Sequence, residues 1–491
     1  MAPAAAKQSK KLRILVMPFF ATSHILPLTD LAFHLAVVRP NDVEVIVAVT
    51  TANAPIVRSA LARRELPSHA SVEVATYAFP EVDGLPWGVE NMSTVKAEDS
   101  TRLEMAATNE ALMRPAQESL IREISPDAIV SDLHFFGWNA GIAFQLGISC
   151  VLFNVVGIFP TLATWRLALS GNVKDAPPGS SVTVPQLPGP EISLPVTELS
   201  EFLRNPPVFD DETGAQYMML LKSCGFVSNT FFDLEREYCE SYEDSGYTKR
   251  TYCVGPLALP MPPPARAGSG RPACLDWLDT MPTHSVVYLC FGSLTNFSEA
   301  QLDELALGLE ASEVPFLWVI RVKTWEPPVG WKDRVGKRGM VVMGWAPQTD
   351  ILQHPSVGAF VSQCGWNSVL ETIAGGGVPV LTWPMVFEQF ITERFVTHVL
   401  RIGERLWPEG AGRRSTRSAE HDVVPGKAIA QSVAKFMENG GAAEAARRRV
   451  MELSPKAHAA MAEGGTSYRD LHQLIDDFIA ARASVAGAAT S

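Results

Sequence analysis

Short apolar runs alternate along this chain with longer segments in which apolar residues recur every three or four positions. Runs of the first kind are typical of buried strands, and spacing of the second kind is typical of helices that cover a sheet with one face. Strands interleaved with helices predict a parallel, doubly wound α/β sheet. In the first half we expect strands at 12–17, 43–49, 72–75, 128–131 and 149–153, with helices at 102–124 and 137–146.

The segment after the first strand is predicted to be a loop over 18–25, with Pro27 beginning an amphipathic helix. The stretch 161–207 is rich in proline, glycine and serine, which predicts surface loops with one short helix. Strand-like segments at 227–231 and 252–256 close the first half.

A second series of strands and helices begins near residue 285. Its expected elements are strands at 285–290, 316–320, 340–343, 357–362 and 378–381, and a helix at 298–311. A last helix follows Gly464-Gly465-Thr466-Ser467, and its apolar stripe needs a partner surface.

The 491 residues are too many for one ordinary domain. The run PMPPPARAGSGRP at 260–272 is the best linker candidate, because proline and glycine break the pattern there. We therefore predict two Rossmann-like domains and a terminal helix, with boundaries at 1–258, a linker at 259–272, 273–465, and 466–491 for the helix and tail.

Composition narrows the partners and the compartment. The net charge of −12 argues against nucleic acid or an anionic membrane, since both require basic patches. Seven cysteines without a CxxC pair favour a reduced compartment over a disulfide or zinc framework. We expect no signal peptide, because Pro18 interrupts the first apolar run, and no segment has the roughly 18 apolar residues of a membrane span. A monomeric, cytoplasmic protein is expected.

Ligand sites of open parallel sheets lie beyond the carboxyl ends of the strands. His24 follows the first strand, and Asp132 follows the fourth. A histidine titrates in the range needed to remove a proton from an attacking hydroxyl, and a buried carboxylate on its other ring nitrogen would hold the required tautomer. We predict His24 as the catalytic base and Asp132 as its partner. Taken alone, they would be an ordinary packing histidine and a helix cap.

Residues 345–389 hold the densest group of specialised side chains. The strand at 357–362 ends before Gly365, and a helix opens with Trp366, Asn367 and Ser368. The free N–H groups of a first helical turn and the positive end of the helix dipole bind anions, and a phosphate fits both.

This stretch contains, in order, the short motifs WAPQ, HxxxGxF, CGWNS, ExxxxG, VP, WP and EQ. With these motifs it resembles the signature box of plant family 1 UDP-sugar-dependent glycosyltransferases. The resemblance implies the GT-B architecture. In it, an acceptor-binding domain and a UDP-sugar-binding domain face each other across a cleft, and the last helix crosses back to the first domain.

The resemblance also implies roles for individual residues. The expected donor contacts are Trp345 stacked on uracil, Ala346 and Gln348 beside the base, Glu371 on the ribose, Asn367, Ser368 and Ser293 at the diphosphate, Trp366 in sugar choice, and Glu388 and Gln389 on the sugar. His24 matches the GHxxP histidine of the family, with Ser23 in place of the glycine; the Ser23 hydroxyl would either touch the sugar or simply end the turn.

Two departures concern the box. Gln363 stands where the family has a histidine at the diphosphate, so a neutral amide replaces a ring that can carry charge. Charge-assisted hydrogen bonds contribute about 1.5–3 kcal/mol and neutral ones about 0.5–1.5, which predicts donor binding weakened by roughly tenfold. The run Gly375-Gly376-Gly377 is one residue longer than usual, and we expect it, too, on the diphosphate side.

The implied reaction is an inverting displacement, in which an acceptor oxygen attacks the anomeric carbon and the helix N-terminus stabilises the leaving UDP. The chain has no Asp-x-Asp motif, so no metal or other cofactor is expected. Gln389 suits glucose as the donor sugar in the family. The acceptor is predicted to be a small lipophilic flavonoid or other phenolic, and a terpenoid fits as well. Its site should be lined by Phe20, Trp87, Phe135 and Phe159.

Other functions stay open at this point. A nucleotide-sugar binding protein with weak catalysis would be consistent with Gln363, and attack at carbon or sulfur would give a C- or S-glycosyltransferase. A nicotinamide oxidoreductase is disfavoured, because no GxGxxG follows Met17 or Cys290.

Overall fold

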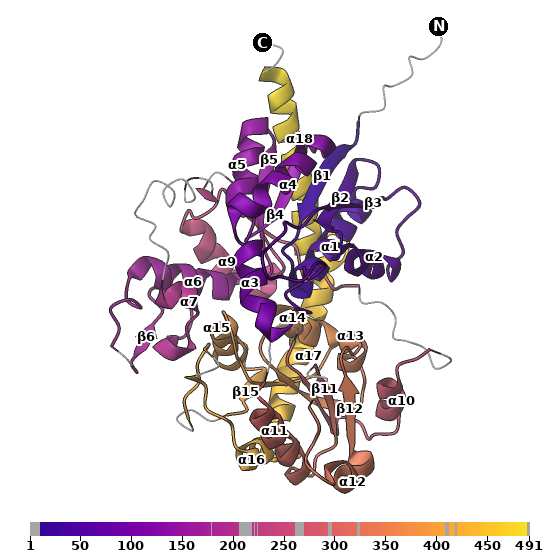
Figure 1. Cartoon of the computed structure of the whole chain (residues 1–491), viewed down its shortest axis with the longest axis vertical. Helices are drawn as coiled ribbons and strands as arrows, with labels where there is room; N and C mark the ends of the chain where they lie inside the picture. The colour runs from indigo at the N-terminus through magenta and orange to yellow at the C-terminus, as the bar shows by residue number, and fades with distance from the viewer. Residues whose placement is uncertain are drawn as a thin grey trace.

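The structure is a computed structural model that describes residues 10–177, 179–205, 219, 221–222, 224–260, 270–292, 297–321, 325–407, 412–417 and 420–488. It contains two large parallel sheets, one from each half of the chain, which Figure 1 shows one above the other. This arrangement confirms the predicted α/β class with two doubly wound sheets.

The first sheet has seven strands, and each neighbouring pair is parallel. Their spatial order is β3 (Val72–Tyr77), β2 (Val43–Thr50), β1 (Leu12–Met17), β4 (Ala128–Asp132), β5 (Ser149–Asn154), β8 (Gly225–Ser228) and β9 (Arg250–Cys253). Its helices are α1 (Thr22–Val38), α2 (Ala54–Ala62), α3 (Ala97–Ala107), α4 (Glu110–Ile124), α5 (Phe136–Leu146), α6 (Ile158–Ser170), α7 (Glu201–Arg204) and α9 (Phe232–Asp244).

The second sheet has six parallel strands. Their order is β12 (Gly339–Met343), β11 (Phe316–Ile320), β10 (Val286–Cys290), β13 (Val357–Ser362), β14 (Val380–Thr382) and β15 (Gly403–Arg405). The helices of this half are α10 (Ala273–Asp279), α11 (Glu299–Ala311), α12 (Trp331–Val335), α13 (Gln348–Leu352), α14 (Trp366–Gly375), α15 (Gln389–Arg394), α16 (Gly426–Phe436) and α17 (Ala442–Met461).

The last helix, α18 (Thr466–Ala488), lies against the first sheet. Its stripe of Leu471, Leu474, Ile475 and Phe478 is buried in one cluster with the apolar side chains of β1, β2 and α1. The family resemblance implies this position, and Figure 1 shows α17 and α18 in yellow running along both halves. Burial of this stripe removes apolar area from water on both partners, which stabilises the association of the chain's end with its beginning.

Three sequence predictions were wrong in detail. The helix α1 begins at Thr22, so 22–25 is helical instead of a loop; the hydroxyl of Ser93 accepts a hydrogen bond from the Thr22 N–H and supplies the missing cap. The expected helix at 102–124 is two helices, because Asn109 leaves the helical conformation and caps α4 through the Leu112 N–H. The third wrong prediction placed residues 161–170 in surface loops, whereas they belong to helix α6.

The rest of the loop-rich stretch forms a small hairpin, β6 (Ser181–Thr183) and β7 (Ser193–Pro195), followed by α7. Glu198, just after this hairpin, is buried and pairs with Arg394 at 2.7 Å and Arg414 at 2.9 Å, both from the second half. This ion cluster joins the two halves beside their sheets. Most of the predicted linker, residues 261–269, lies outside the described residues.

Candidate active site

The carboxyl ends of the central strands of both sheets meet in one region. Met17 pairs with Ser131 in the first sheet, and Cys290 pairs with Ser362 in the second, so the loops that follow these strands are neighbours within each sheet. The side-chain amide of Asn367 in α14 donates to the Ser23 carbonyl at the start of α1 at 2.9 Å. The two edges therefore face each other.

His24 and Asp132 form a hydrogen-bonded pair on the first edge. The distance between His24 Nδ1 and Asp132 Oδ2 is 2.8 Å, and the aspartate side chain is 1% exposed while the imidazole remains partly open. Burial alone would raise the pKa of Asp132, but His24 and His134 beside it hold that pKa well below its usual value. The ionised carboxylate keeps a proton on His24 Nδ1, which leaves Nε2 as the basic atom.

His134 is a second histidine beside Asp132. Its Nδ1 lies 2.9 Å from Asp132 Oδ1, its backbone N–H donates to the same oxygen, and its ring stacks on Phe19 at 4.0 Å. The position two residues after Asp132, at the same strand end, was the signal that could have identified it. Among the described residues, His24, Asp132 and His134 are the group close enough to hold a metal ion; here both Nδ1 atoms are bonded to the carboxylate instead.

The first turn of α14 has the geometry of an anion site. Gly365 precedes it in an extended conformation and offers no side-chain cap, so the N–H groups of the first turn point toward the open end of the helix. Gln363 lies before this turn and is 7% exposed, with its Oε1 unpaired within the described part of the chain. A Cβ on Gly292 would lie 2.0 Å from Gln363 Nε2, and the φ of Gly292 is +68°, so only glycine fits there. Ser293, next in the chain, lies outside the described residues.

Three of the predicted nucleotide contacts are joined by hydrogen bonds. Gln348 donates to Glu371 Oε2 at 2.8 Å and to Ser368 Oγ at 3.0 Å, and it accepts from the Tyr288 hydroxyl at 3.2 Å. Burial raises the pKa of Glu371 to about 7, although the bond from Gln348 opposes the shift. Trp345 is 65% exposed, so one face of a flat ring is open for stacking. The set offers hydrogen-bond acceptors beside an aromatic face.

The other residues predicted to contact the donor have different surroundings. Ala346 is buried beside Trp345, and Glu388 is half-buried, with a pKa that burial raises. Gln389 uses its Oε1 to accept from the Met385 and Val386 N–H groups at 3.0 and 3.1 Å, which leaves its Nε2 for a ligand.

Trp366 lies between the two halves instead of in an open site. Its indole is 2% exposed, its Nε1 donates to the Asn229 carbonyl at 2.7 Å, and its ring fills the space that a Cβ on Gly157 would occupy. Asn229 also reaches Asn367 at 3.4 Å. The indole therefore positions α14 against the first half, and sequence reasoning did not identify its partners Asn229 and Gly157.

Of the four predicted acceptor side chains, Phe20 and Phe135 contact each other, but the four do not form one exposed surface. Phe20, Phe135 and Phe159 are fully buried among other rings, so they belong to the core in this structure, whereas Trp87 is 96% exposed. The apolar ring in contact with the histidine is Phe19, whose centroid lies 5.5 Å from that of His24. Phe20 and Phe135 contact each other directly behind it.

The position of the triple glycine, Gly375-Gly376-Gly377, corrects a sequence prediction. Gly375 ends α14, Gly376 caps it in the left-handed region, and the Gly377 carbonyl accepts from Arg447, which also bonds to Gly358 at the start of β13. At about 1.5 Å per residue, this end of the helix is roughly 15 Å from the diphosphate turn. The prediction that the extra glycine lies on the diphosphate side is therefore wrong.

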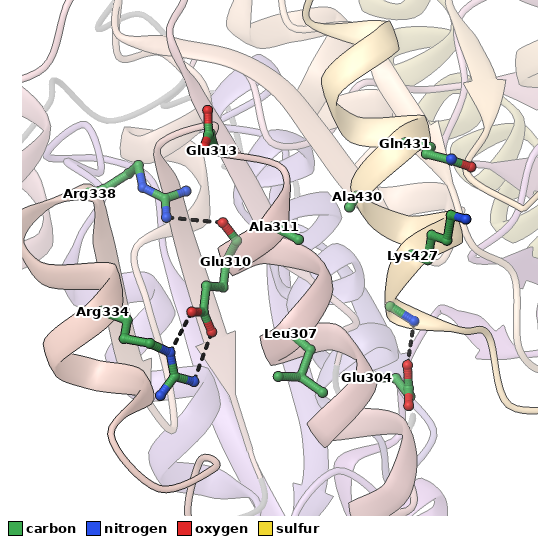
Figure 2. Close-up of a pocket in the computed structure, with 11 residues that line it drawn as sticks. Glu304, Leu307, Glu310, Ala311, Glu313, Arg334, Arg338, Lys427, Ala430 and Gln431 are labelled. Carbon is green, nitrogen blue, oxygen red and sulfur yellow. Dashed lines mark hydrogen bonds and ion pairs between the residues drawn. The ribbon is translucent and has the colours of Figure 1, made fainter.

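A surface groove between α11, α12 and α16 lies away from this region (Figure 2). Two of its charged side chains, Glu310 and Arg334, pair with each other, and Glu304 accepts from the Gly426 N–H at the start of α16. Arg338 donates to backbone carbonyls at the end of α11. Nothing in the groove resembles the chemistry of the facing edges.

Two Rossmann-like sheets whose carboxyl edges face each other define the class of GT-B glycosyltransferases. Residues 273–402 match the family described as UDP-glucoronosyl and UDP-glucosyl transferase. The chain is 34% identical to UDP-glycosyltransferase 73E1 of Stevia rebaudiana, covering 97% of this chain and 98% of that protein. It is 32% identical to UDP-glucose flavonoid 3-O-glucosyltransferase 7 of Fragaria ananassa, covering 96% and 97%.

The crystal structure of UGT73P12 of Glycyrrhiza uralensis, complexed with glycyrrhetinic acid 3-O-monoglucuronide, has a TM-score of 0.84 and 28% identity, and the match covers 98% of each chain. The chain therefore belongs to the plant family 1 UDP-sugar-dependent glycosyltransferases, and its activity is glycosyl transfer from a UDP-sugar. Within the described residues, no helix has both the length and the apolar character needed to cross a membrane.

Proposed function

We propose that this enzyme transfers glucose from UDP-glucose, with inversion, to a hydroxyl of a small lipophilic acceptor. The observation that carries the proposal is the 2.8 Å bond between His24 Nδ1 and Asp132, opposite the first turn of α14. Nε2 of His24 takes the proton of the acceptor hydroxyl as its oxygen attacks the anomeric carbon, and Asp132 stabilises the imidazolium that forms. The helix N-terminus stabilises the charge that develops on the leaving diphosphate.

In this proposal Trp345, Gln348 and Glu371 hold the uridine, and Asn367 and Ser368 hold phosphate. Glu388 and the Nε2 of Gln389 hold the sugar hydroxyls. Gln389 supports glucose as the sugar, and one relative carries UDP-glucose in its name. No metal ion takes part, because the helix terminus already provides positive potential at the leaving group.

For the acceptor we propose a phenolic such as a flavonoid, with a terpenoid as the alternative. The first choice is supported by the flavonoid named for the Fragaria enzyme, and the second by the glycyrrhetinic acid glucuronide in the Glycyrrhiza structure. The seven free cysteines agree with the reduced, cytoplasmic location that we propose.

The test is incubation of the purified protein with UDP-glucose and a mixed panel of flavonoids, simple phenolics, terpenoid alcohols and thiols. Mass spectrometry should detect a product with one added hexose, and acid treatment should release the sugar from an O-glucoside but not from a C-glucoside. UDP binding without modification of any acceptor would contradict the proposed activity and favour the nucleotide-sugar binding protein. A product with UDP-glucuronate but not with UDP-glucose would contradict the proposed donor.

A further inference from the structure

Arg321 lies at the same sheet edge as the predicted diphosphate site, directly after β11. Its Nη1 donates to the Gly292 carbonyl at 3.1 Å, and its Nη2 donates to the Ser93 carbonyl of the first half. The guanidinium is half-buried, and burial lowers the pKa of Arg321 from its usual value. The group stays cationic, since arginine does not lose its proton in proteins.

Among the residues that the structure describes, the hydrogen-bond partners of this cation are neutral. In the part of the chain that the structure describes, both of its hydrogen bonds go to backbone carbonyls and no carboxylate pairs with it. By contrast, the buried Arg394 and Arg414 each pair with glutamates. A partly buried charge without a counter-ion is unfavourable, so an anion that reached Arg321 would gain from it.

The position of Arg321 beside Gln363 places it at the predicted diphosphate site. The strands β11, β10 and β13 are consecutive in the sheet, and they lead to Arg321, Gly292 and Gln363 respectively. The Gly292 turn touches both side chains, since Gln363 Nε2 occupies the place of its absent Cβ. Arg321 and Gln363 thus flank one turn beside the N-terminus of α14.

We propose that Arg321 binds the diphosphate of the donor and supplies the positive charge that the neutral Gln363 does not. The inference rests on the proposed function, because it assigns the anion to a UDP-sugar. Its second contact adds a positioning role: the Ser93 hydroxyl caps α1 through the Thr22 N–H at 2.9 Å, two residues before His24. The Arg321 side chain therefore connects the negatively charged diphosphate of the donor to α1, the helix that carries His24.

The test compares UDP with uridine, which shares the base and ribose but has no phosphate. Binding to the full-length protein is measured by calorimetry for wild type, Arg321→Met, Arg321→Lys and the double variant Arg321→Met with Gln363→His. We expect Arg321→Met to raise the dissociation constant of UDP at least about tenfold and that of uridine less than about twofold. Arg321→Lys should retain part of the UDP affinity, and the double variant should regain part of it.

Arg338→Met is the matched control. Among the described residues, Arg338 (labelled in Figure 2) likewise donates to backbone carbonyls, those of Leu309 and Glu310. It precedes β12 and so lies at the opposite, amino edge of the same sheet. This variant should bind both ligands as wild type does.

Equal losses of UDP and uridine in Arg321→Met would show a merely structural role and overturn the inference. Unchanged UDP affinity in that variant, with normal binding by wild type, would overturn the inference and leave the proposed function intact. A wild-type protein that binds neither ligand would overturn both.

Discussion

Asn367 Nδ2 donates a hydrogen bond to the Ser23 carbonyl at 2.9 Å, although the two residues are 344 positions apart. Within an α-helix that carbonyl would accept from the N–H four residues later, but the residue there is Pro27, which has none. The proline inside α1 thus leaves one carbonyl free for α14. The bond connects the residue before the candidate base to the helix that receives the diphosphate.

Pro27→Ala should therefore make the protein more stable and less active. The new N–H would compete with Asn367 for the Ser23 carbonyl, while the loss of an interior proline would stabilise α1 by about 1–3 kcal/mol. We expect a higher melting temperature and a kcat lowered several-fold. Pro115→Ala in α4, a helix-interior proline of the same half, is the control and should change only stability. An unchanged kcat in Pro27→Ala would contradict the proposed role of the Asn367 bond.

The His24→Ala variant should lose most of its turnover but still bind UDP. Removal of a general base costs about 10² to 10⁴ in rate, whereas the His24 ring is hydrogen-bonded to Asp132 in the first half and the predicted uridine contacts Gln348 and Glu371 lie in the second half. Asp132→Asn should also be impaired, because an amide no longer holds the proton on Nδ1 and leaves the buried site without its anion. The measurements are kcat and UDP affinity; turnover like that of wild type in His24→Ala would refute the assignment.

Donor affinity should fall in mild acid because of Glu371. Its pKa in the free protein is raised to about 7 by burial, and only the ionised carboxylate accepts from both ribose hydroxyls. Binding of UDP-glucose should therefore be strongest above pH 7 and weaken as the pH falls below that value. The diphosphate of UDP-glucose gains no proton in this range. Glu371→Gln should bind more weakly at pH 8 and with little pH dependence, and an equally steep pH dependence in that variant would assign the titration to another group.

Gln363→His should lower the dissociation constant of the donor by up to roughly tenfold, as a charge-assisted bond replaces a neutral one. The side chain is buried against Gly292 and its Oε1 has no partner in the described residues, so a histidine would not displace an existing bond to that oxygen. Titration of UDP at pH 6 and pH 8 tests the cause, because the gain should be larger at pH 6, where the imidazole is cationic. If the dissociation constant of UDP at pH 6 is the same in Gln363→His as in wild type, or higher, the prediction is contradicted.

Glu235 predicts a second pH effect, on folding. This buried carboxyl accepts from the Thr230 hydroxyl and from the Ile158 and Phe159 N–H groups that open α6. Burial raises its pKa to about 7 from 4.5. Since the folded-state pKa is above the unfolded one, the contribution to stability is fully present below about pH 4.5 and is lost as the pH rises through about 7. The loss amounts to about 3 kcal/mol.

Glu235→Gln should remove this pH dependence, because an amide of the same size does not ionise. Denaturant unfolding at pH 5.5 and pH 8 should show a smaller difference for the variant than for wild type. Glu237→Gln, two residues further along α9, serves as the control and should keep the wild-type difference. Equal pH dependence in wild type and Glu235→Gln would show that another group is responsible.

The sequence by itself determined the strands, the two edges and much of the candidate chemistry. Apolar periodicity is a local property, and the rule that ligands bind beyond the carboxyl ends of parallel strands needs only the strand positions. It was enough to place His24 near Asp132, and to place Gln363, Asn367 and Ser368 around one helix start. The motif of the box added Trp345, which is exposed in the structure, and Gln348 and Glu371, which the structure joins by a hydrogen bond.

Only the tertiary structure decided which side chains face the other half. Arg321 of the second half reaches the Ser93 carbonyl of the first half, and the Ser93 hydroxyl caps α1, because distant segments meet at the edges; no local pattern encodes that meeting. The same packing buries Phe20, Phe135, Phe159 and Trp366, although their sequence positions beside the edges suggested contact with ligands. A side chain at a strand end can point into the core or toward the facing sheet with the same local sequence, and the orientation of the two halves determines which.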